Sequence, residues 1–552
     1  MVRWWFSNVV WVLCFAALCG AQVTFTVFPT TVVSGPIPSD FCSFSIELDA
    51  VQPMFTYAGT NSSLRVAFVN LLNHLKSYNT GQRGPNIRVG GNSADTSEFV
   101  NSSTALQAGD SYRVSQAVLD ALAAAVPLFN GTVIVGLNFR QNTPPTYDIT
   151  FALAAQSTLG SYLEALEIGN EENYMVYNGV KNASTFNAAA YVQQFNAYIS
   201  ALVAAGIPLR FFQAPTTGVN PVGPVFNASW MASFVSSYKT SLTAVCVHYY
   251  PLSVCPNSDG SFPSPSPTPA LLLSPSLAAS AMAPLPALIA PALQNGLPFH
   301  IGEGDAVCCS GANVTASGMV AALWTLDTMF AMAAMGVSRF NFHGGPTGDN
   351  GPIRFFITGS NPTRYSFLPS VNAPFLGMAA FTFATANGAR LVQTVSSNPG
   401  SLISCWVVLD ATGTLRVTVV HKDTSPNAVA AQITISLPGT TVVLPAQMAL
   451  LLPGPGGLTS TSGLTWMGMS WDSSTDGNPI GTRVTQTVQP TVGLNGYQIM
   501  LAPYSAAILT ISTTAPTPSN ATSASWAVRV GGRALHWAAL AMLLSAVWHL
   551  DT

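Results

Sequence analysis

The sequence predicts an α/β fold class, a (β/α)8 TIM barrel followed by an all-β sandwich domain. Short β-branched or aromatic runs alternate with Ala- and Leu-rich stretches of helical length. This alternation is typical of parallel strands joined by helical crossovers. Eight strand candidates are present, which is the number that closes such a barrel. After about residue 385 the helical stretches end, and strands separated by turns predict the sandwich.

The predicted elements follow one another along the chain. The barrel strands are expected at 41–48, 86–91, 133–139, 163–170, 210–215, 244–250, 299–304 and 339–345. Helices are expected at 62–78, 114–127, 149–159, 184–205, 228–240, 269–293 and 316–335. Sandwich strands are expected at 389–395, 402–410, 414–422, 430–437, 440–445 and 497–512. The barrel then occupies 22–385 and the sandwich 386–513, with 22–35 available as a further sandwich strand.

Both ends of the chain predict the secretory route. Residues 1–21 have a basic start, an apolar stretch and small residues before the cut, as a cleaved signal peptide does. Residues 514–525 are rich in Pro, Ser and Thr and predict a flexible stalk. Residues 526–552 predict a GPI-attachment signal with Ser523 as the attachment residue. A single-pass membrane anchor and a terminal helix packed on the body are the alternatives. Either anchor places the protein on the outer cell surface.

Charge is scarce along the whole chain. Charged residues make up 7%, and 19 basic against 22 acidic residues give a net charge of −3. No Lys/Arg cluster is present, which argues against a nucleic-acid-binding protein. Such a chain needs another solubilising device, and N-x-S/T sequons predict N-glycans. The seven sequons are at Asn61, Asn101, Asn130, Asn182, Asn227, Asn313 and Asn520.

The cysteines agree with an oxidising compartment. Eight are present, and two of them leave with the signal peptide. The six that remain predict disulfides, whose pairing the sequence does not give. A local bridge between Cys246 and Cys255 is plausible because one loop separates them. No CxxC or HExxH motif is present, so no metal site is expected.

Glu is the residue with the most unusual placement. The chain has seven Glu residues, and four of them lie in the stretch LEALEIGNEENY at 163–174. Glu171 follows the fourth predicted strand and Glu303 ends the seventh, where the loops of such barrels carry the chemistry. Two carboxylates facing each other across a barrel mouth are what glycoside hydrolysis requires. The neighbouring Glu164, Glu167 and Glu172 are expected to be solvated or to be ion partners of helices.

Six blocks of the sequence follow one another in a recognisable order: SFSIE (43–47), IRVGGNSAD (87–95), EIGNE (167–171), VHYY (247–250), IGEG (301–304) and 322–345. They resemble, in order, the blocks of glycoside hydrolase family 79, the β-glucuronidases and heparanases. This family belongs to the retaining glycosidases with carboxylates on strands four and seven. The resemblance covers about 40–380 and implies Glu171 as acid/base and Glu303 as nucleophile. It also implies that Glu47, Asn92 and Asn170 line the sugar subsite.

The sixth predicted strand adds two more candidates. His248 and Tyr250 share one face because side chains alternate along a strand. A Tyr at this place orients the nucleophile in enzymes of the resembled group, which favours Tyr250, with Tyr249 as the alternative. Aromatic packing in the barrel core is the other interpretation of this segment.

The chain departs from the family pattern at two places. Gly304 and Asp305 follow the nucleophile position, and Asp305 is expected to raise the pKa of the acid or to repel an anionic sugar. The segment after the eighth strand has no Tyr to bind a uronate carboxylate, so Arg354 or backbone amides would have to serve. Four Lys and no basic run argue against heparanase-like action on sulfated chains.

The sequence as a whole predicts a secreted retaining glycoside hydrolase. The expected activity is that of a β-glucuronidase on β-glucuronides of wall or matrix glycans, by double displacement and without a cofactor. Its expected partners are an oligo- or polysaccharide substrate and, through the C-terminal anchor, a membrane. One alternative is a β-glucosidase or β-xylosidase of the same clan. The other is a catalytically silent carbohydrate-binding surface protein.

Overall fold

The structure, a computed structural model, describes most of the chain between residues 22 and 512. The described ranges are 22–55, 66–79, 81–100, 103–219, 226–256, 265–309, 314–344, 351–358, 366–439 and 444–512. All of them fall within one compact unit (Met1–Thr514). The predicted signal peptide (1–21), the stalk (514–525), Ser523 and the anchor segment (526–552) lie outside the described residues.

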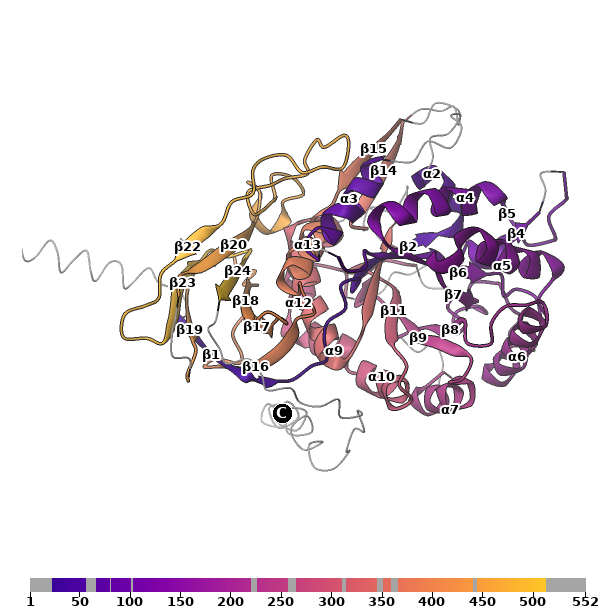
Figure 1. The fold of residues 1–552 in the computed structure, drawn as a ribbon, viewed down its shortest axis with the longest axis horizontal. Coiled ribbons are helices and arrows are strands. Elements are labelled where there is room, and N and C mark those ends of the chain that lie inside the picture. Colours follow the sequence, from indigo (N-terminus) through magenta and orange to yellow (C-terminus); the bar gives the residue numbers. More distant parts are fainter. Residues whose placement is uncertain are drawn as a thin grey trace, which may run out of the picture. The chain divides into compact units, whose positions relative to one another are not determined.

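Eight parallel strands close into a barrel, which confirms the predicted fold class (Figure 1). Each strand is short and almost entirely buried, because the barrel interior and the helical layer cover both of its faces. Neighbouring strands pair in parallel around the full circle. The strands are β2 (Cys42–Glu47), β3 (Asn86–Gly90), β6 (Thr132–Leu137), β7 (Leu163–Ile168), β8 (Phe212–Gly218), β9 (Leu242–Tyr249), β11 (Phe299–Gly304) and β13 (Arg339–Gly344).

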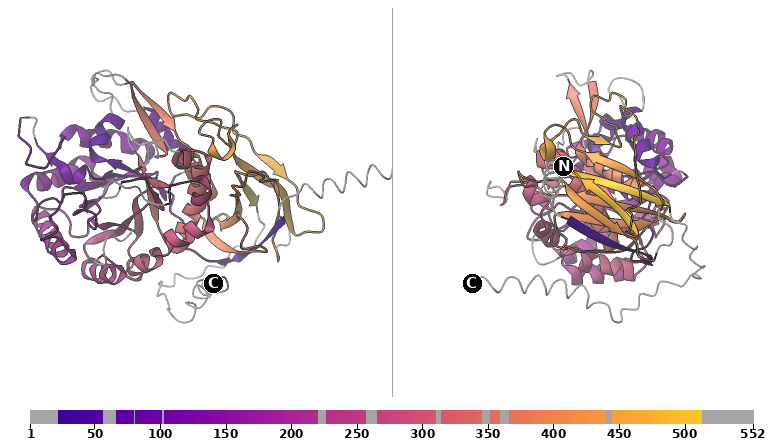
Figure 2. Two further views of the ribbon diagram at one scale, coloured as in Figure 1. Left: turned by 180° about the vertical axis from the view of Figure 1, so that it is seen from behind. Right: turned by 90° about the vertical axis from the view of Figure 1, so that its left-hand side faces the viewer.

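Helices surround the barrel strands in the views of Figures 1 and 2. Those before β11 are α2 (Val51–Phe55), α3 (Val66–Lys76), α4 (Gln116–Ala125), α5 (Thr146–Leu159), α6 (Ala188–Ala204), α7 (Ala228–Tyr238), α8 (Pro269–Leu272), α9 (Pro275–Met282) and α10 (Leu285–Gln294). Those after it are α11 (Val314–Ser317), α12 (Met319–Met335) and α13 (Ala373–Ala384). In the described part of the chain no single helix meets the length and hydropathy needed to cross a membrane, and α9 with α10 meets them only as a pair bent by 46°.

The prediction of one continuous helix over 269–293 is wrong, because three separate helices occupy this range. Each of the three has Pro in its first turn. Pro has no N–H to give to a preceding helical turn, so it suits a helix start and interrupts a longer helix. The side chains of Thr268 and Ser274 accept backbone hydrogen bonds at the starts of α8 and α9.

The sequence did not predict α13, and its surroundings explain why. Eleven of its twelve residues are buried, because α12 packs on one side and strands of the β domain pack on another. A helix that is covered on all sides has no polar stripe, so it lacks the 3.6-residue period that marks amphipathic helices. Helix α13 thus joins the barrel to the β domain.

The β domain is one hydrogen-bonded sheet of ten strands whose two halves share a core. The core combines Val417 and Leu509 from one half with Ile433 and Tyr497 from the other, so the sheet folds over itself as a sandwich. Its strands are β1 (Gln22–Val32), β16 (Arg390–Ser396), β17 (Ile403–Leu409), β18 (Thr414–His421), β19 (Ala431–Ser436), β20 (Ala446–Leu452), β21 (Thr465–Trp466), β22 (Gln486–Val488), β23 (Gly496–Leu501) and β24 (Ser505–Ser512).

One predicted sandwich strand is largely untested and another is divided in the structure. The expected strand at 440–445 lies mostly outside the described residues, and β20 begins directly after it. The long run at 497–512 divides into β23 and β24 around a short turn. The early segment that forms β1 pairs with β16 on one side and with β19 on the other. Figure 1 shows this indigo strand beside the orange strands from the far end of the sequence.

Polar contacts also join the barrel to the β domain. Asp327 on α12 accepts hydrogen bonds from Ser404 Oγ (2.6 Å) and Trp406 Nε1 (2.7 Å) and pairs with Lys422. Burial opposes the charge on Asp327, but Lys422 and the two donors outweigh it and lower the pKa of this carboxyl. The ionised Asp327 therefore anchors α12 to β17 and β18.

Candidate active site

The two Glu residues predicted to do the chemistry meet at one end of the barrel. Glu171 follows β7 and Glu303 is the fifth residue of β11. A carboxylate oxygen of each and a ring nitrogen of His248 all lie within 4.8 Å of one another. The side chains of Glu171 and Glu303 are 18% and 11% exposed. Both carboxylates are thus mostly enclosed, yet solvent still reaches them at the carboxyl ends of the strands.

Glu303 is surrounded by donors and positive charge. Its Oε2 accepts a hydrogen bond from Arg88 Nη1 (2.8 Å), and its Oε1 accepts one from the hydroxyl of Tyr250 (2.9 Å). The Nδ1 atoms of His248 and His343 lie 3.9 Å and 3.5 Å from its two oxygens. Burial alone would raise the pKa of Glu303, but His343, His248, Arg88 and Tyr250 together lower it below its ordinary value. Glu303 is therefore ionised at neutral pH.

Arg88, on β3, connects the carboxylates inside the barrel. Its guanidinium is fully buried and donates to Glu167 Oε1 from Nε (2.7 Å) and to Ser45 Oγ (3.0 Å), as well as to Glu303. Glu167 also accepts from Gln213 Nε2 (2.6 Å). Burial would lower the pKa of Arg88, but the charges of Glu167 and Glu303 raise it overall. The expectation that Glu167 is solvated or contacts a helix is wrong, because it is a buried partner of Arg88.

Asn170 and Asn92 form the next contact outward. Asn170 Oδ1 accepts from Arg88 Nη2 (2.7 Å), while its Nδ2 donates to Asn92 Oδ1 (3.1 Å). Asn92 is exposed. The two amides therefore lie in contact beside Glu171, and Asn170 is held by the same guanidinium that holds Glu303.

Glu47 lies against the backbone that follows β3. Its carboxylate accepts hydrogen bonds from the N–H groups of Asn92 (3.2 Å) and Ser93 (2.9 Å). Gly91 has a φ of +73°, and a Cβ there would lie 2.1 Å from Glu47 Oε1. Glu47 thus shapes the loop that presents Asn92.

His248 in β9 and Tyr250 directly after this strand lie on one face, and Tyr249 lies on the other. His248 Nδ1 lies 3.1 Å from Glu171 Oε1, and Tyr250 bonds Glu303. Burial would lower the pKa of His248, but Glu303 and Glu171 raise it overall. Tyr249 is 1% exposed, its ring lies 6.5 Å from that of Phe340, and no described residue bonds its hydroxyl.

Glu171 has a strained backbone that its neighbour holds in place. Its φ is +46°, in the left-handed region that residues other than Gly rarely adopt. Both oxygens of the next residue, Glu172, accept from the N–H of Thr216 on β8 (3.1 and 3.0 Å). Burial raises the pKa of Glu172 to about 7, although the bonds from Thr216 act against it. Glu172 is 1% exposed, so the expectation that it is solvated is wrong.

Glu164 lies at the opposite end of β7 from the catalytic candidates. It pairs with Arg339 (2.7 Å) and accepts from Thr132 Oγ1 (2.6 Å). Burial acts to raise its pKa, but Arg339 above all lowers it to about 2. Glu164 was expected to be solvated or to pair with a helix. It does form an ion pair, but its partner Arg339 is the first residue of strand β13.

Asp305 lies buried directly after β11. It is fully buried, and its Oδ1 accepts from the N–H of Ala306 (2.8 Å) while no described residue bonds its Oδ2. Burial raises its pKa well above the ordinary value. Burial thus disfavours the charged form of this carboxyl, which acts against the expected repulsion of an anionic sugar.

The disulfide differs from the suggested local bridge. Cys255 bonds Cys309, with 5.0 Å between their Cα atoms. Cys246 is free and buried in the middle of β9. Its sulfur packs on Gly302, where a Cβ would approach it to 2.1 Å. The wall of the barrel therefore holds Cys246 away from the loop that carries Cys255.

Three of the sequon asparagines lie in described segments, and all three are exposed: Asn130, Asn182 and Asn227. Asn227 also begins α7, where its Oδ1 accepts from the N–H of Trp230 (3.0 Å). Glycosylation takes the other side-chain atom, Nδ2, and so is compatible with this cap. Asn61, Asn101, Asn313 and Asn520 lie outside the described residues.

Arg88 and His343 were not expected from the sequence. Arg88 carried a signal, because it is a charged residue within an otherwise apolar predicted strand. His343 carried a weaker one, as a polar residue near the end of the eighth strand. What the sequence does not contain is the direction of each side chain across the barrel, and this direction brings both of them to Glu303.

The fold is similar to that of solved glycosidases. A 4-O-α-L-rhamnosyl-β-D-glucuronidase from Fusarium oxysporum 12S has a TM-score of 0.67 at 19% identity, over 88% of this chain and 100% of that one. The bifunctional glucanase-xylanase CelM2, from a metagenome library, has 0.57 at 12%, over 89% and 99%. AbfB, a family 51 α-L-arabinofuranosidase from Bifidobacterium longum, has 0.59 at 11%, over 89% and 100%. Neither protein-family models nor curated protein sequences give a match. The chain thus has the fold of TIM-barrel glycosidases with a β domain.

Proposed function

We propose that this protein is a retaining glycoside hydrolase that acts on β-glucuronides. The observation that carries the proposal is the Glu171–Glu303 pair, whose nearest oxygens lie within 4.8 Å at the barrel mouth. Retaining glycosidases hold their two carboxyl groups about 5–5.5 Å apart, whereas inverting enzymes need about 6.5–9.5 Å to admit a water molecule. The short separation therefore supports a double displacement.

The surroundings of each carboxylate support its role. Glu303 is kept ionised by Arg88 and Tyr250, as an attacking nucleophile must be. In the first step it bonds the anomeric carbon while Glu171 gives a proton to the departing oxygen. In the second step Glu171 takes a proton from water, which attacks the same carbon and frees Glu303. His248, in contact with Glu171 and near Glu303, orients the acid/base.

The identity of the sugar rests on two lines of support. The sequence blocks resemble those of β-glucuronidases, and one similarly folded protein is itself a rhamnosyl-β-D-glucuronidase. In the described part of the site, Arg88 is fully engaged, and the imidazole of His343 places ring nitrogens beside Glu303, with 24% of its side chain exposed. His343 is thus the described side chain best placed to meet a uronate carboxylate.

We also propose that the protein lies on the outer cell surface, that a GPI anchor holds it there, and that it carries N-glycans.

The first test is hydrolysis of 4-nitrophenyl glycosides by the full-length protein and by Glu303→Gln. We expect turnover of the β-glucuronide by the natural protein and a loss of at least about 10⁴-fold in the variant, because the nucleophile is gone. Turnover of only the β-glucoside or β-xyloside would keep the mechanism and reject the glucuronide. Folded protein that binds but does not hydrolyse any of these glycosides would instead indicate a carbohydrate-binding protein.

The second test separates the acid/base from the nucleophile. Glu171→Gln should still form the glycosyl-enzyme from a 4-nitrophenyl substrate, since this leaving group needs little protonation. Its breakdown should be slow, because no base activates water, and added azide should restore turnover by giving a β-glycosyl azide. An α-glycosyl azide, or rescue of Glu303→Gln alone, would contradict the assigned roles.

A further inference from the structure

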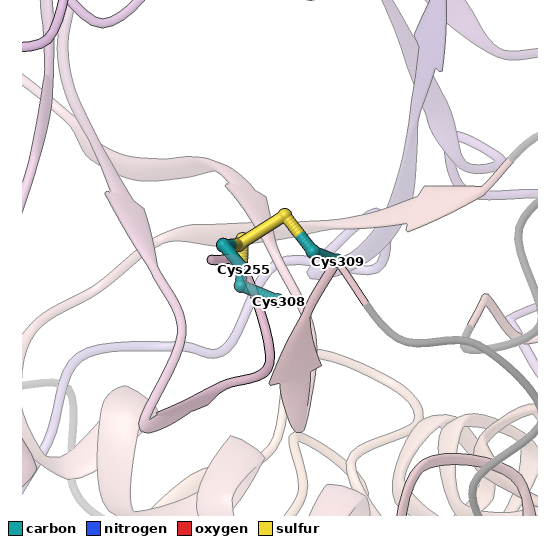
Figure 3. A group of neighbouring side chains, drawn as sticks. All are labelled: Cys255, Cys308 and Cys309. Atoms are coloured by element: carbon teal, nitrogen blue, oxygen red, sulfur yellow. A yellow bond between two sulfur atoms is a disulfide. The ribbon is translucent and has the colours of Figure 1, made fainter. Parts of the chain in front are cut away.

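A third sulfur lies against the disulfide. Cys308 Sγ is 3.2 Å from Cys255 Sγ and 3.8 Å from Cys309 Sγ, while Cys255 and Cys309 are bonded (Figure 3). Cys308 itself is a free thiol. The half-cystine Cys255 therefore faces two neighbouring cysteines at once, and only one of them can be its partner at any time.

Two short strands hold this group together. β10 (Leu252–Ser253) pairs in parallel with β12 (Val307–Cys308), and the N–H of Val254 donates to the carbonyl of Cys308 (3.0 Å). Consecutive side chains of an extended strand point to opposite faces. Cys309, however, has a φ of +54°, which turns its side chain back toward the side of Cys308. Both sulfurs of the pair can thus meet Cys255 without any change in the pairing of the strands.

We propose that Cys255 exchanges its disulfide partner between Cys309 and Cys308. The thiolate of Cys308 attacks Cys255 Sγ and forms the new sulfur–sulfur bond. The bond to Cys309 breaks, its electron pair leaves on the sulfur of Cys309, and the proton lost by Cys308 ends on Cys309. The step needs no oxidant or reductant. The three sulfurs form a compact triangle, so a rotation of the Cys309 side chain brings them into line for attack.

The exchange moves the free thiol from one environment to another. Cys308 is half-buried beside the candidate catalytic pair, and burial, followed by the charges of Glu171 and Glu303, raises the pKa of its thiol to about 12. Cys309 is exposed. Its φ of +54° is uncommon for a residue other than Gly, and the new pairing releases Cys309 from the bond that holds it there. The second isomer therefore presents an accessible thiol that small disulfides or electrophiles can modify.

Thiol counts of full-length variants test the proposal independently of any glycosidase activity. Protein purified without reductant is denatured in N-ethylmaleimide, and the labels are counted by intact mass. For Cys309→Ser we expect one label fewer than in the natural protein, because Cys308 takes over the bond to Cys255. One label more, from Cys255 and Cys308 both free, would overturn the proposal. Cys308→Ser should give one fewer and Cys255→Ser one more, as the two reference counts.

The natural protein provides a second readout that does not depend on a variant's folding. The folded protein is held at about pH 8.5, denatured in the maleimide and digested, and fragment spectra assign the label to Cys308 or to Cys309. We expect both labelled positions, with the Cys309 fraction rising to a plateau over hours. Label on Cys308 alone at every time would overturn the exchange.

Discussion

A single hydroxyl distinguishes two adjacent tyrosines at the candidate site. Tyr250 donates to Glu303 Oε1, whereas the hydroxyl of Tyr249 has no partner among the described residues and its ring packs near Phe340. A hydrogen bond to a charged group contributes about 1.5–3 kcal/mol. If Glu303 is the nucleophile, this bond both fixes its direction and keeps it ionised. The two positions therefore form a matched pair for mutation.

We expect Tyr250→Phe to lower kcat/KM on the accepted glycoside by roughly 10- to 100-fold, mainly through kcat. Tyr249→Phe should stay within about twofold of the natural protein. Steady-state kinetics of both variants provide the measurement, with thermal unfolding to show that each is folded. Equal losses in the two variants would mean that aromatic packing, rather than the bond to Glu303, gives this segment its importance.

At the scale of residues, the sequence predicted which side chains lie together at the candidate site, but not the hydrogen bonds and ion pairs between them. Glu171, Glu303 and Tyr250 were found because strand ends and a period of two are legible in a sequence. The links from Arg88 to Glu167 and from Glu172 to Thr216 join strands far apart in the chain. Nothing local encodes such links, and for the same reason the Cys255–Cys309 pairing was missed.

At the scale of elements, the turn after β3 depends on one Gly. A Cβ on Gly91 would lie 2.1 Å from Glu47 Oε1, whereas one on Gly296, after α10, would have no atom within 4 Å. The two residues have similar φ values, +73° and +68°. Replacing either Gly by Ala therefore has the same backbone cost, that of an L-residue in the left-handed region. The two substitutions differ in the space available to the added Cβ.

We expect Gly296→Ala to lower the free energy of unfolding by about 1–2 kcal/mol, the cost of a left-handed L-residue. Gly91→Ala should lose a further 1–3 kcal/mol or so, because Glu47 must leave the N–H groups of Asn92 and Ser93. Denaturant unfolding of the two variants measures the difference. Equal losses would show that the loop moves aside and that Glu47 does not hold it.

The strands of the barrel were predictable because each lies in or beside a short run with β-branched, aromatic or aliphatic residues. The helices were predictable where one face is polar. The helix predictions failed where a helix has no polar face, as in the buried α13. They also failed where Pro residues divide a long apolar run, as in α8 to α10. The local pattern of polar and apolar residues therefore predicts helices and strands well, except where every face of an element is buried.

At the scale of the whole molecule, two buried Glu residues make stability depend on pH with opposite signs. Burial raises the pKa of Glu172 to about 7, so the folded protein keeps this proton at pH values where the unfolded chain has lost it. The stability that protonated Glu172 adds to the folded protein is fully present below about pH 4.5 and is lost as the pH rises toward 7. Arg339 lowers the pKa of Glu164 to about 2, so its contribution is present above about pH 4.5 and is lost as the pH falls toward 2.

For Glu172→Gln we expect the natural protein to lose stability relative to the variant between about pH 4.5 and 7, by roughly 3 kcal/mol in total. The difference should be constant above this window. Thermal unfolding of both proteins from pH 4 to 8 gives the comparison. A difference that does not change with pH would show that the pKa of Glu172 is the same in the folded and unfolded states.

For Glu164→Gln the dependence should be reversed. The natural protein should be the more stable one above about pH 4.5, and its advantage, roughly 3 kcal/mol, should shrink as the pH falls toward 2. The same unfolding experiment at pH 2 to 6 measures this. An advantage that persists unchanged at pH 2 would mean that Arg339 does not act on Glu164 through charge.

The position of β1 has a consequence for synthesis on the ribosome. This strand leaves the ribosome before every other strand described here, yet its partners β16 and β19 lie more than 350 residues further along the chain. Until they emerge, its unpaired edges are exposed, and the barrel between them is free to fold first. The sheet closes only after β16 and β19 have been made. A chain released early would therefore carry an open, aggregation-prone strand, which gives quality control in the cell a direct way to recognise it.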